Sequence, residues 1–313
     1  MLLPSSLAVL WRYRHNQRSC RLTALLTGGL LTTVLLFGLL RLYLPPTDAP
    51  LLTVGLAAVP TTRELLLGQD AETITASLRR YSHSVDVLAA AGAQVVLLPE
   101  KLASLTPSSR EENLAILSGA ASNNKITLIA GLSTQENQLF NAALIFGPDG
   151  ALLQSYRKHH LLPPYESRYT PGKDLALLDV GETNHAGIAI CKDMDFVQPA
   201  KAYSRQGVGI LFVPALDFHD DGWLHARVAI MRGVEGNYSV ARAAQWGLLT
   251  VSDSRGRLLG TTATDTAAET SLLSKVPLGS GHSVYSLTGD WLAWLSLLLT
   301  AQAAIRLVWP KHC

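Results

Sequence analysis

The stretch Gly187 to Phe196, GIAICKDMDF, is a short apolar run that ends on a cysteine and passes directly into charged residues. A continuous apolar run of this length is typical of a strand that is buried on both faces of a sheet. Where such a strand ends, the sheet gives way to a loop, and α/β folds place their ligands at that edge. Cys191 therefore marks both a strand of the fold and a candidate functional position.

Similar apolar runs lie on both sides of this stretch, and helical stretches separate several of them. The other predicted strands cover 51–59, 94–99, 126–133, 142–147, 151–158 and 209–215. Helical spacing of apolar residues and helix end signals predict helices over 74–88, 109–123 and 221–235. Residues 146–150 and 252–257 are typical of tight turns between paired strands. Together these signals predict an α/β fold with a mixed sheet.

An uncharged run from Leu22 to Leu40 stands outside this alternation. Its 19 residues are close to the roughly 20 that span a bilayer as a helix. Four arginines precede it, and the positive-inside rule then puts the N-terminus in the cytoplasm: Arg12, Arg14, Arg18 and Arg21. A signal peptide has the same order of charge and apolar run. The residues after the run offer no clear cleavage site of small residues, so we predict an uncleaved anchor.

A second uncharged run covers Trp291 to Ile305, and with Arg306 snorkelling it extends to Trp309. A buried core helix is the alternative for so short a run. We predict a second membrane span. In chain order, the predicted organisation is a cytoplasmic tail at 1–21, a transmembrane helix at 22–44, an external catalytic domain at 50–285 and a transmembrane helix at 289–309.

The composition agrees with an anchored globular domain. Charged residues are 16% of the 313 residues, well below the roughly 25% of a typical soluble protein, and the mean hydropathy is +0.20. Such a chain is not disordered, and three cysteines are too few for a disulfide scaffold. A net charge of +2 gives no indication of a nucleic-acid partner. Cys20 and Cys313 fall in the predicted cytoplasmic tails, so Cys191 is predicted to be a free thiol.

Two further polar residues lie at the ends of apolar runs. Glu100 ends VVLLPE and Lys158 lies in SYRKHHLLPPYES. Taken singly, each residue has an ordinary structural interpretation. Glu100 is typical of an acid in the first turn of a helix, and Lys158 is typical of an exposed cation in a hairpin. Cys191 is typical of a small residue that fills the core. The order Glu, Lys, Cys with these flanks favours one shared site.

Other common site motifs are absent from the sequence. It contains no GxSxG elbow, no Walker loop, no HExxH and no CxxC. Neither the adjacent pair His159 and His160 nor the six-residue separation of His219 and His225 favours a metal site. We therefore predict neither a metal nor a cofactor.

On these residues the chain resembles the nitrilase, or carbon–nitrogen hydrolase, superfamily, whose catalytic set is Glu, Lys and Cys in that order. Within it, the chain looks most like the apolipoprotein N-acyltransferases, over about 51–308. The similar stretches are the lysine loop 158–166, residues 225–256 and the junction 283–291. The resemblance implies a four-layer αββα sandwich. Two features depart from those acyltransferases: they carry a bundle of several N-terminal membrane helices, and they have an aromatic residue where Lys192 stands.

The resemblance and the chemistry of these groups assign roles. A thiolate is the nucleophile in cysteine chemistry, and a nearby carboxylate can take the thiol proton, so Glu100 is the candidate base for Cys191. Lys158 and the backbone N–H of Lys192 are the candidates to stabilise the oxyanion. Glu166 is expected to orient either Lys158 or the acyl acceptor.

These assignments predict acyl transfer from a phospholipid, through a thioester on Cys191, to an amine such as a lipoprotein N-terminus. An amidase that uses water as acceptor is the alternative, and a third possibility is a non-catalytic binding protein that keeps the fold. The expected location is the bacterial inner membrane, with the catalytic domain on the extracytoplasmic face and both termini in the cytoplasm. The sequence leaves the oligomeric state open.

Overall fold

The computed structural model describes residues 2–12, 14–44, 49–60, 71–181, 184–264 and 268–308. The chain divides into two units, Met1–Asp48 and Ala49–Cys313. Trp309 and Cys313, which the predictions above include, lie outside the described residues.

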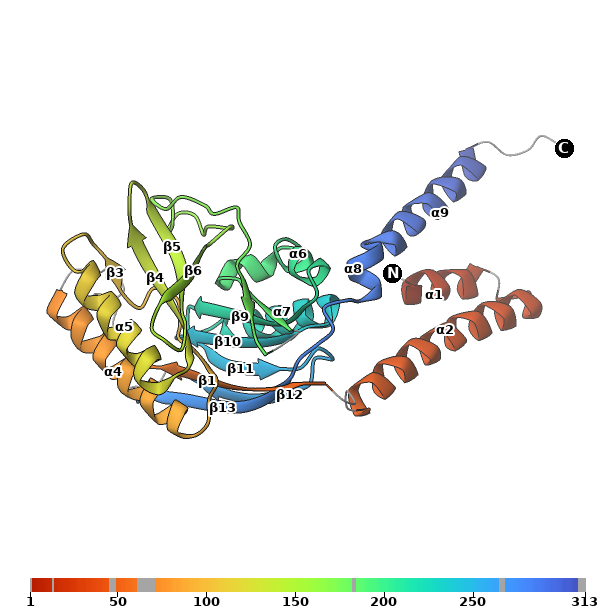
Figure 1. The fold of residues 1–313 in the computed structure, drawn as a ribbon. Coiled ribbons are helices and arrows are strands. Elements are labelled where there is room, and N and C mark those ends of the chain that lie inside the picture. The colour runs from red at the N-terminus through yellow and green to blue at the C-terminus, as the bar shows by residue number, and fades with distance from the viewer. Residues whose placement is uncertain are drawn as a thin grey trace. The chain divides into compact units, whose positions relative to one another are not determined.

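The first of two sheets in the larger unit has seven strands (Figure 1). Six follow the order β13-β1-β2-β4-β5-β6, and β3 pairs with β4. The strands are β1 (Leu51–Ala58), β2 (Val95–Leu97), β3 (Ser104–Leu105), β4 (Thr127–Gln135), β5 (Leu139–Phe146), β6 (Leu152–Arg157) and β13 (Thr270–Pro277). Strands β1, β2 and β4 run parallel, whereas β13, β5 and β6 pair antiparallel with their neighbours, so this sheet is mixed.

The second sheet has six strands in the order β12-β11-β10-β9-β8-β7. They are β7 (Leu177–Asp179), β8 (His185–Ile188), β9 (Val208–Leu216), β10 (Ser239–Gln245), β11 (Leu248–Ser252) and β12 (Leu258–Ala263). Here β8, β9 and β10 run parallel and the remaining pairs are antiparallel. The prediction from strand and helix alternation was one mixed sheet, and the structure has two.

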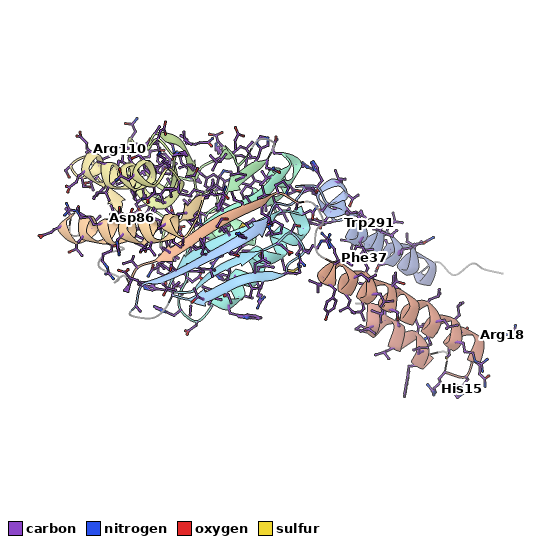
Figure 2. The ribbon with its side chains drawn as sticks, turned by 60° about the horizontal axis from the view of Figure 1, so that its bottom comes forward. His15, Arg18, Phe37, Asp86, Arg110 and Trp291 are labelled. Carbon is purple, nitrogen blue, oxygen red and sulfur yellow. The ribbon has the colours of Figure 1, made fainter. Side chains whose placement is uncertain are left out.

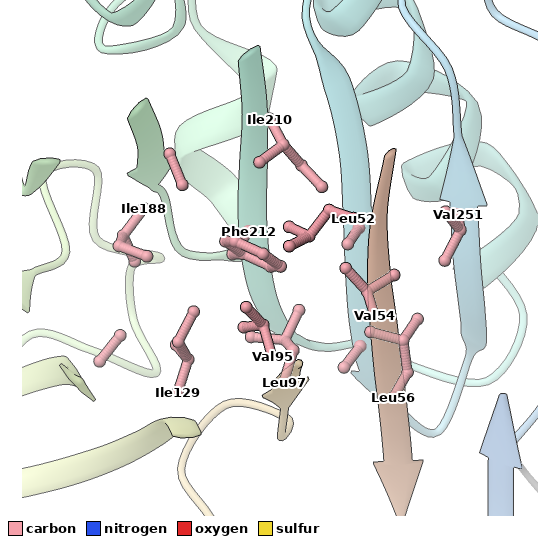
Figure 3. Close-up of a cluster of buried hydrophobic side chains, with 14 of the residues drawn as sticks. Leu52, Val54, Leu56, Val95, Leu97, Ile129, Ile188, Ile210, Phe212 and Val251 are labelled. Atoms are coloured by element: carbon pink, nitrogen blue, oxygen red, sulfur yellow. The ribbon is translucent and has the colours of Figure 1, made fainter. Parts of the chain in front are cut away.

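Buried side chains from both sheets form the central core between them (Figure 3). The first sheet contributes Leu52, Val54, Leu56, Val95, Leu97 and Ile129, and the second contributes Ile188, Ile210, Phe212 and Val251. Alternate residues of β1 face the other way, so that Ala57 packs under the helices while Leu56 packs between the sheets. Each large side chain buried in this way stabilises the fold by roughly 1.5–3 kcal/mol. Burial on both faces is the reason why the strands read as continuous apolar runs.

Helices cover the outer face of each sheet. Helices α4 (Ala71–Ala90) and α5 (Arg110–Asn124) pack on the first sheet, and α6 (Ala200–Arg205) and α7 (Gly222–Gly236) pack on the second. Asp86 of α4 accepts a hydrogen bond from Asn124 at the end of α5 (2.6 Å), and Figure 2 labels Asp86 on that outer layer. The order helix, sheet, sheet, helix is the four-layer sandwich that the resemblance implied.

Most local predictions agree with the structure. Each predicted strand falls on an observed one, the three predicted helices are α4, α5 and α7, and the two turns join β5 to β6 and β11 to β12. The strands β3, β7, β10, β11, β12 and β13 and the helix α6 were not predicted from local patterns. The strands β3 and β7 are two and three residues long, and β12 and β13 have an exposed face, so none of these four forms a long apolar run. The buried strands β10 and β11 contain polar residues such as Arg242 and Thr250, which interrupt the apolar pattern.

The smaller unit is a helical hairpin of α1 (Leu2–Arg12) and α2 (Gln17–Tyr43). The hydroxyls of Ser6 and Thr27 are 2.9 Å apart, so α1 folds back along α2. The residues predicted as a cytoplasmic tail, 1–21, thus hold a helix and the first turn of the next. Asn16 caps α2 by accepting from the Ser19 backbone N–H (3.2 Å), which explains why that helix starts before position 22. Figure 2 shows His15 and Arg18 at the turn and Phe37 farther along α2.

Within the described residues, α2 is the one helix long and apolar enough to cross a membrane, and none of its side chains is buried. The predicted second span coincides with α9 (Trp291–Val308), which follows the short helix α8 (Val284–Thr288). Among the described residues, the apolar stretch found in α9 is Trp291–Gln302, which is shorter than a span. This stretch therefore does not support the predicted C-terminal span.

Candidate active site

Three residues predicted from the sequence meet where the two sheets adjoin. Glu100 follows β2 and Lys158 follows β6 in the first sheet, and Cys191 follows β8 in the second. The Lys158 ammonium is 2.8 Å from Glu100 Oε1, and both side chains are 2% exposed. The backbone N–H of Glu100 donates to the Ala215 carbonyl at the end of β9 (3.2 Å). This hydrogen bond ties the loop after β2, here called the glutamate loop, to the second sheet. Contacts between the sheets thus bring the three residues together.

Glu166 joins this group through four donors. Its Oε1 accepts from Lys101 Nζ (2.6 Å) and Asn141 Nδ2 (2.6 Å), and its Oε2 accepts from Lys158 Nζ (3.0 Å) and the Leu162 backbone N–H (2.8 Å). Both carboxylate oxygens are therefore occupied by protein donors. This arrangement fits a residue that orients Lys158 better than one that binds the acyl acceptor.

Lys101 and Asn141 are site residues that sequence reasoning missed. Asn141 Nδ2 lies 2.5 Å from Glu100 Oε1 as well as near Glu166, so one amide holds both carboxylates. The available signal was a polar residue inside the apolar strand β5, because a buried amide needs partners. Lys101 stood directly after Glu100, but nothing in the sequence distinguished it from a surface lysine.

The electrostatics of the site follow from these contacts. Burial acts to raise the pKa of Glu166, but Lys158 and Lys101 outweigh it and lower that pKa to about 2. Burial likewise acts to lower the pKa of Lys158, but Glu100, Cys191 and Glu166 raise it above its ordinary value. The site therefore holds an ionised carboxylate beside a lysine that keeps its charge at neutral pH.

The Cys191 thiol is free, as predicted, and partly buried. It donates to the Leu216 carbonyl (3.6 Å). Burial raises its pKa to about 12, the charge of Glu100 adds to the increase, and Lys158 opposes it. The resting thiol is thus protonated at neutral pH, so its reaction requires a base within reach.

A sharp turn presents the cysteine. Cys191 has φ +43°, a left-handed backbone conformation that is uncommon for a side chain other than glycine, and it opens the 3₁₀ helix η1 (Cys191–Asp195). Buried Asp193 accepts from the Ile190 N–H (3.0 Å), the Tyr156 hydroxyl (2.8 Å) and the His160 N–H (2.8 Å). Asp193 therefore fastens the cysteine turn to the lysine loop.

Lys192, whose backbone N–H was predicted to stabilise an oxyanion, lies directly after the nucleophile at the start of η1. Its side chain turns to Asp195, with 3.3 Å between the ammonium and the carboxylate. The role of the Lys192 backbone N–H as a donor to the oxyanion stays a proposal.

A second charged cluster lies beside the cysteine. Arg242 on β10 is 1% exposed, and its Nη1 and Nη2 donate to the two oxygens of buried Asp217 (2.9 and 2.5 Å). The Cys191 sulfur, an Asp217 oxygen and a ring nitrogen of His225 lie within 4.8 Å of one another. These three are close enough to hold a metal, but the guanidinium already engages both carboxylate oxygens. The cluster is better described as a buried ion pair with a histidine attached.

A pocket of about 360 Å³ opens onto the cysteine. Its charged wall consists of Glu100, Lys101, Lys158, Glu166 and Arg168, and its apolar and aromatic wall of Leu139, Leu162, Tyr165, Tyr169, Leu216, Phe218 and Trp246, with Cys191 and two serines completing the lining. The rings of Tyr165 and Phe218 are 5.6 Å apart, and both side chains are exposed.

A comparison with models of protein families identifies the family to which this chain belongs. Residues 58–276, more than half of the chain, match the model of the carbon-nitrogen hydrolase family. The chain belongs to the carbon–nitrogen hydrolase family. Its Glu100, Lys158 and Cys191 follow the chain order of the superfamily's catalytic set.

Individual members of the family divide between two activities. The chain is 25% identical to an apolipoprotein N-acyltransferase of Geobacter metallireducens over 85% of this chain and 55% of the relative. It thus spans about half the length of that relative. It is 30% identical to an omega-amidase of Mus musculus over 64% of this chain and 83% of the relative.

Solved structures of the carbon–nitrogen hydrolase family share the fold. An amidase from Nesterenkonia sp. AN1, in complex with acrylamide, matches 81% of this chain and 99% of its own with a TM-score of 0.65 at 19% identity. A form of that amidase with an acetamide moiety on its active-site cysteine matches with a TM-score of 0.63 at 21% identity, over 75% and 93% of the two chains. These likenesses show the fold alone.

In this hydrolase domain, Gly131 on β4 leaves no room for a side chain behind the glutamate loop. A Cβ there would lie 2.5 Å from the Pro99 carbonyl oxygen and 2.6 Å from the Glu100 Cα. We expect Gly131→Ala to displace Glu100, lower activity at least about tenfold and cost about 1–3 kcal/mol of unfolding free energy. Turnover and chemical denaturation measure the two effects.

Gly119→Ala is the matched control for that substitution. Gly119 lies inside α5, and a Cβ at this position would meet nothing within 4 Å. The control is expected to keep full activity and to gain up to about 1 kcal/mol, because alanine favours a helix interior over glycine. Equal activity in the two variants would show that the close approach of β4 does not position Glu100.

Proposed function

We propose that this protein transfers an acyl group from a phospholipid to an amine, such as a lipoprotein N-terminus, through a thioester on Cys191. The observation that carries the proposal is the pocket, in which the thiol shares a cavity of about 360 Å³ with a largely apolar and aromatic wall. An acyl chain needs such a wall beside the reacting carbonyl. The apolar helix α2 and the 25% identity to an apolipoprotein N-acyltransferase support the same proposal.

The first half-reaction forms the thioester. Glu100 takes the proton of the Cys191 thiol as the sulfur attacks the ester carbonyl. Lys158 and the backbone N–H of Lys192 stabilise the resulting oxyanion, and one such donor is commonly worth roughly 3 kcal/mol. The carbon–oxygen bond then breaks, and the departing alcohol, a lysophospholipid, takes the proton from Glu100.

The second half-reaction repeats the steps with an amine. Glu100 accepts a proton from the attacking amine, and the tetrahedral oxyanion is held by the same donors. The carbon–sulfur bond breaks and the proton returns to the sulfur, so the products are an N-acylated amine and the free thiol. Glu166 and Asn141 keep Lys158 and Glu100 in place throughout, because they bond to them directly.

We further propose that α2 anchors the chain in the bacterial cytoplasmic membrane, with the catalytic domain on the extracytoplasmic face. The four arginines that precede the apolar run of α2 at Leu22 support a cytoplasmic N-terminus by the positive-inside rule. The large apolar side chains of α9 from Trp291 to Leu299 are exposed, which supports contact of that helix with the bilayer. A cytoplasmic C-terminus, through the predicted span at 289–309, stays a prediction.

A membrane-anchored amidase, with water in place of the amine, is the second candidate. The 30% identity to an omega-amidase over 83% of that relative favours it. The first half-reaction would then release an amine or ammonia from an amide, and hydrolysis would follow. A non-catalytic binding protein is the least favoured function, because Glu100, Lys158 and Cys191 lie together in one pocket.

Intact mass spectrometry of the full chain separates the two enzymatic functions. Incubation with phosphatidylethanolamine vesicles is expected to add the mass of one acyl chain, and a diacyl-lipopeptide is then expected to remove it and become N-acylated. An acyl adduct from a small aliphatic amide, with none from the vesicles, would contradict acyl transfer and favour the amidase.

A further inference from the structure

His225 belongs to the charged cluster beside the nucleophile but not to the pocket wall as described. One of its ring nitrogens lies within 4.8 Å of the Cys191 sulfur. Its Nδ1 is 3.5 Å from Asp217 Oδ1, and its Nε2 is 3.4 Å from Asp221 Oδ2. A carboxylate near each ring nitrogen favours the imidazolium, because both of its ring nitrogens are donors.

The charged groups around His225 come from three parts of the fold. Asp217 directly follows β9, Asp221 precedes α7, and Arg242 lies on β10. The hydrogen bond to Asp217 is the largest influence and raises the pKa of His225, burial opposes it, and Arg242 opposes it more weakly than the two carboxylates support it. The surroundings therefore favour the charged ring.

A charge on His225 acts on the Cys191 sulfur together with the other charged groups around it. In the pocket, the cations Lys158 and Lys101 pair with the anions Glu100 and Glu166. In the second cluster, Arg242 pairs with Asp217 through two hydrogen bonds. Arg168 also lines the pocket, and Asp221 adds a carboxylate beside His225. A charged His225 adds one cation to this set, and a cation within about 4–6 Å favours the charged form of a neighbouring acid.

We infer that His225 is a positioning residue for Cys191: held as an imidazolium between Asp217 and Asp221, it places a second cation beside the sulfur and favours the thiolate. This inference rests on Cys191 being the nucleophile of the proposed function. It assigns a role to the Asp217–His225–Arg242 cluster, which the Glu100, Lys158 and Cys191 set does not use.

Alkylation of Cys191 by iodoacetamide tests the inference without any acyl donor. The rate is followed against pH on the full chain, by mass spectrometry of the peptide that contains Cys191. His225→Gln keeps hydrogen-bonding capacity but loses the charge, and is expected to slow alkylation about tenfold near neutral pH and to move the midpoint of the profile upward. His225→Lys keeps a charge and is expected to react at the native rate.

His185→Gln is the matched control, because His185 also pairs with an aspartate, with Nδ1 2.8 Å from Asp179 Oδ1, at the exposed start of β8. It is expected to leave the profile unchanged. A native profile in His225→Gln would overturn the inference. So would equally slow alkylation in His225→Lys and His225→Gln with native unfolding midpoints, because the effect would then come from shape. Since alkylation needs no substrate, a failure of acyl transfer from phospholipid leaves this test unaffected.

Discussion

Cys191→Ala is expected to abolish thioester formation and to reduce turnover by a factor on the order of 10⁴ or more, because removal of a covalent nucleophile leaves only binding and oxyanion stabilisation. The fold should persist. The sulfur makes one weak hydrogen bond, to the Leu216 carbonyl at 3.6 Å, and alanine is close to cysteine in size. A change of about 1 kcal/mol in unfolding free energy is expected. Intact mass spectrometry after incubation with phospholipid measures the adduct, and thermal unfolding measures the fold.

Cys20→Ala is the control for this experiment. Cys20 lies in α2, in the other unit of the chain, so its removal should leave the acyl adduct in place. An adduct of unchanged mass on the Cys191→Ala chain would refute the assignment of the nucleophile. Such a result would direct the search to Cys20 or to another nucleophile, and it would remove the premise of the two half-reactions described above.

Lys158→Met is expected to inactivate the enzyme and to lower its unfolding free energy by about 3–5 kcal/mol. The ammonium contacts Glu100 at 2.8 Å and Glu166 at 3.0 Å, and all three side chains are buried. Without the lysine, Glu100 keeps the Asn141 amide but loses its only cationic partner among the described ion pairs. An uncompensated buried charge is the costly outcome, and oxyanion stabilisation is lost with it. Chemical denaturation and turnover are the measurements.

Two further variants separate the loss of charge from the loss of packing. Lys158→Met combined with Glu100→Gln removes both members of the ion pair and should recover part of the stability without any activity. Lys173→Met, at an exposed position, should change stability by less than about 0.5 kcal/mol. If Lys158→Met unfolds like the native chain, the buried ion pair does not contribute in the way the contacts indicate.

Much of the fold could be predicted because a strand that is buried on both faces has an uninterrupted apolar sequence. The run before Cys191, like that before Glu100, is apolar without interruption because its strand lies between a helix layer and a second sheet. The strands β12 and β13 lack such a run, because they alternate between exposed and partly exposed positions. The number of sheets could not be predicted either, since apolar periodicity reports burial but not which strand pairs with which.

The sequence by itself determined the strands that precede Glu100, Lys158 and Cys191, the helices α4, α5 and α7 and the order of those three residues, because each depends on residue type and short-range spacing. Only the tertiary structure decided that Asn141 holds two carboxylates and that His225 stands beside the sulfur. Asn141 contacts two residues that are 25 and 41 positions away in the sequence. Such contacts arise from sheet pairing and from packing between the layers. The physical reason is that a hydrogen bond or a charge acts over a few ångströms of space, whatever the distance along the chain.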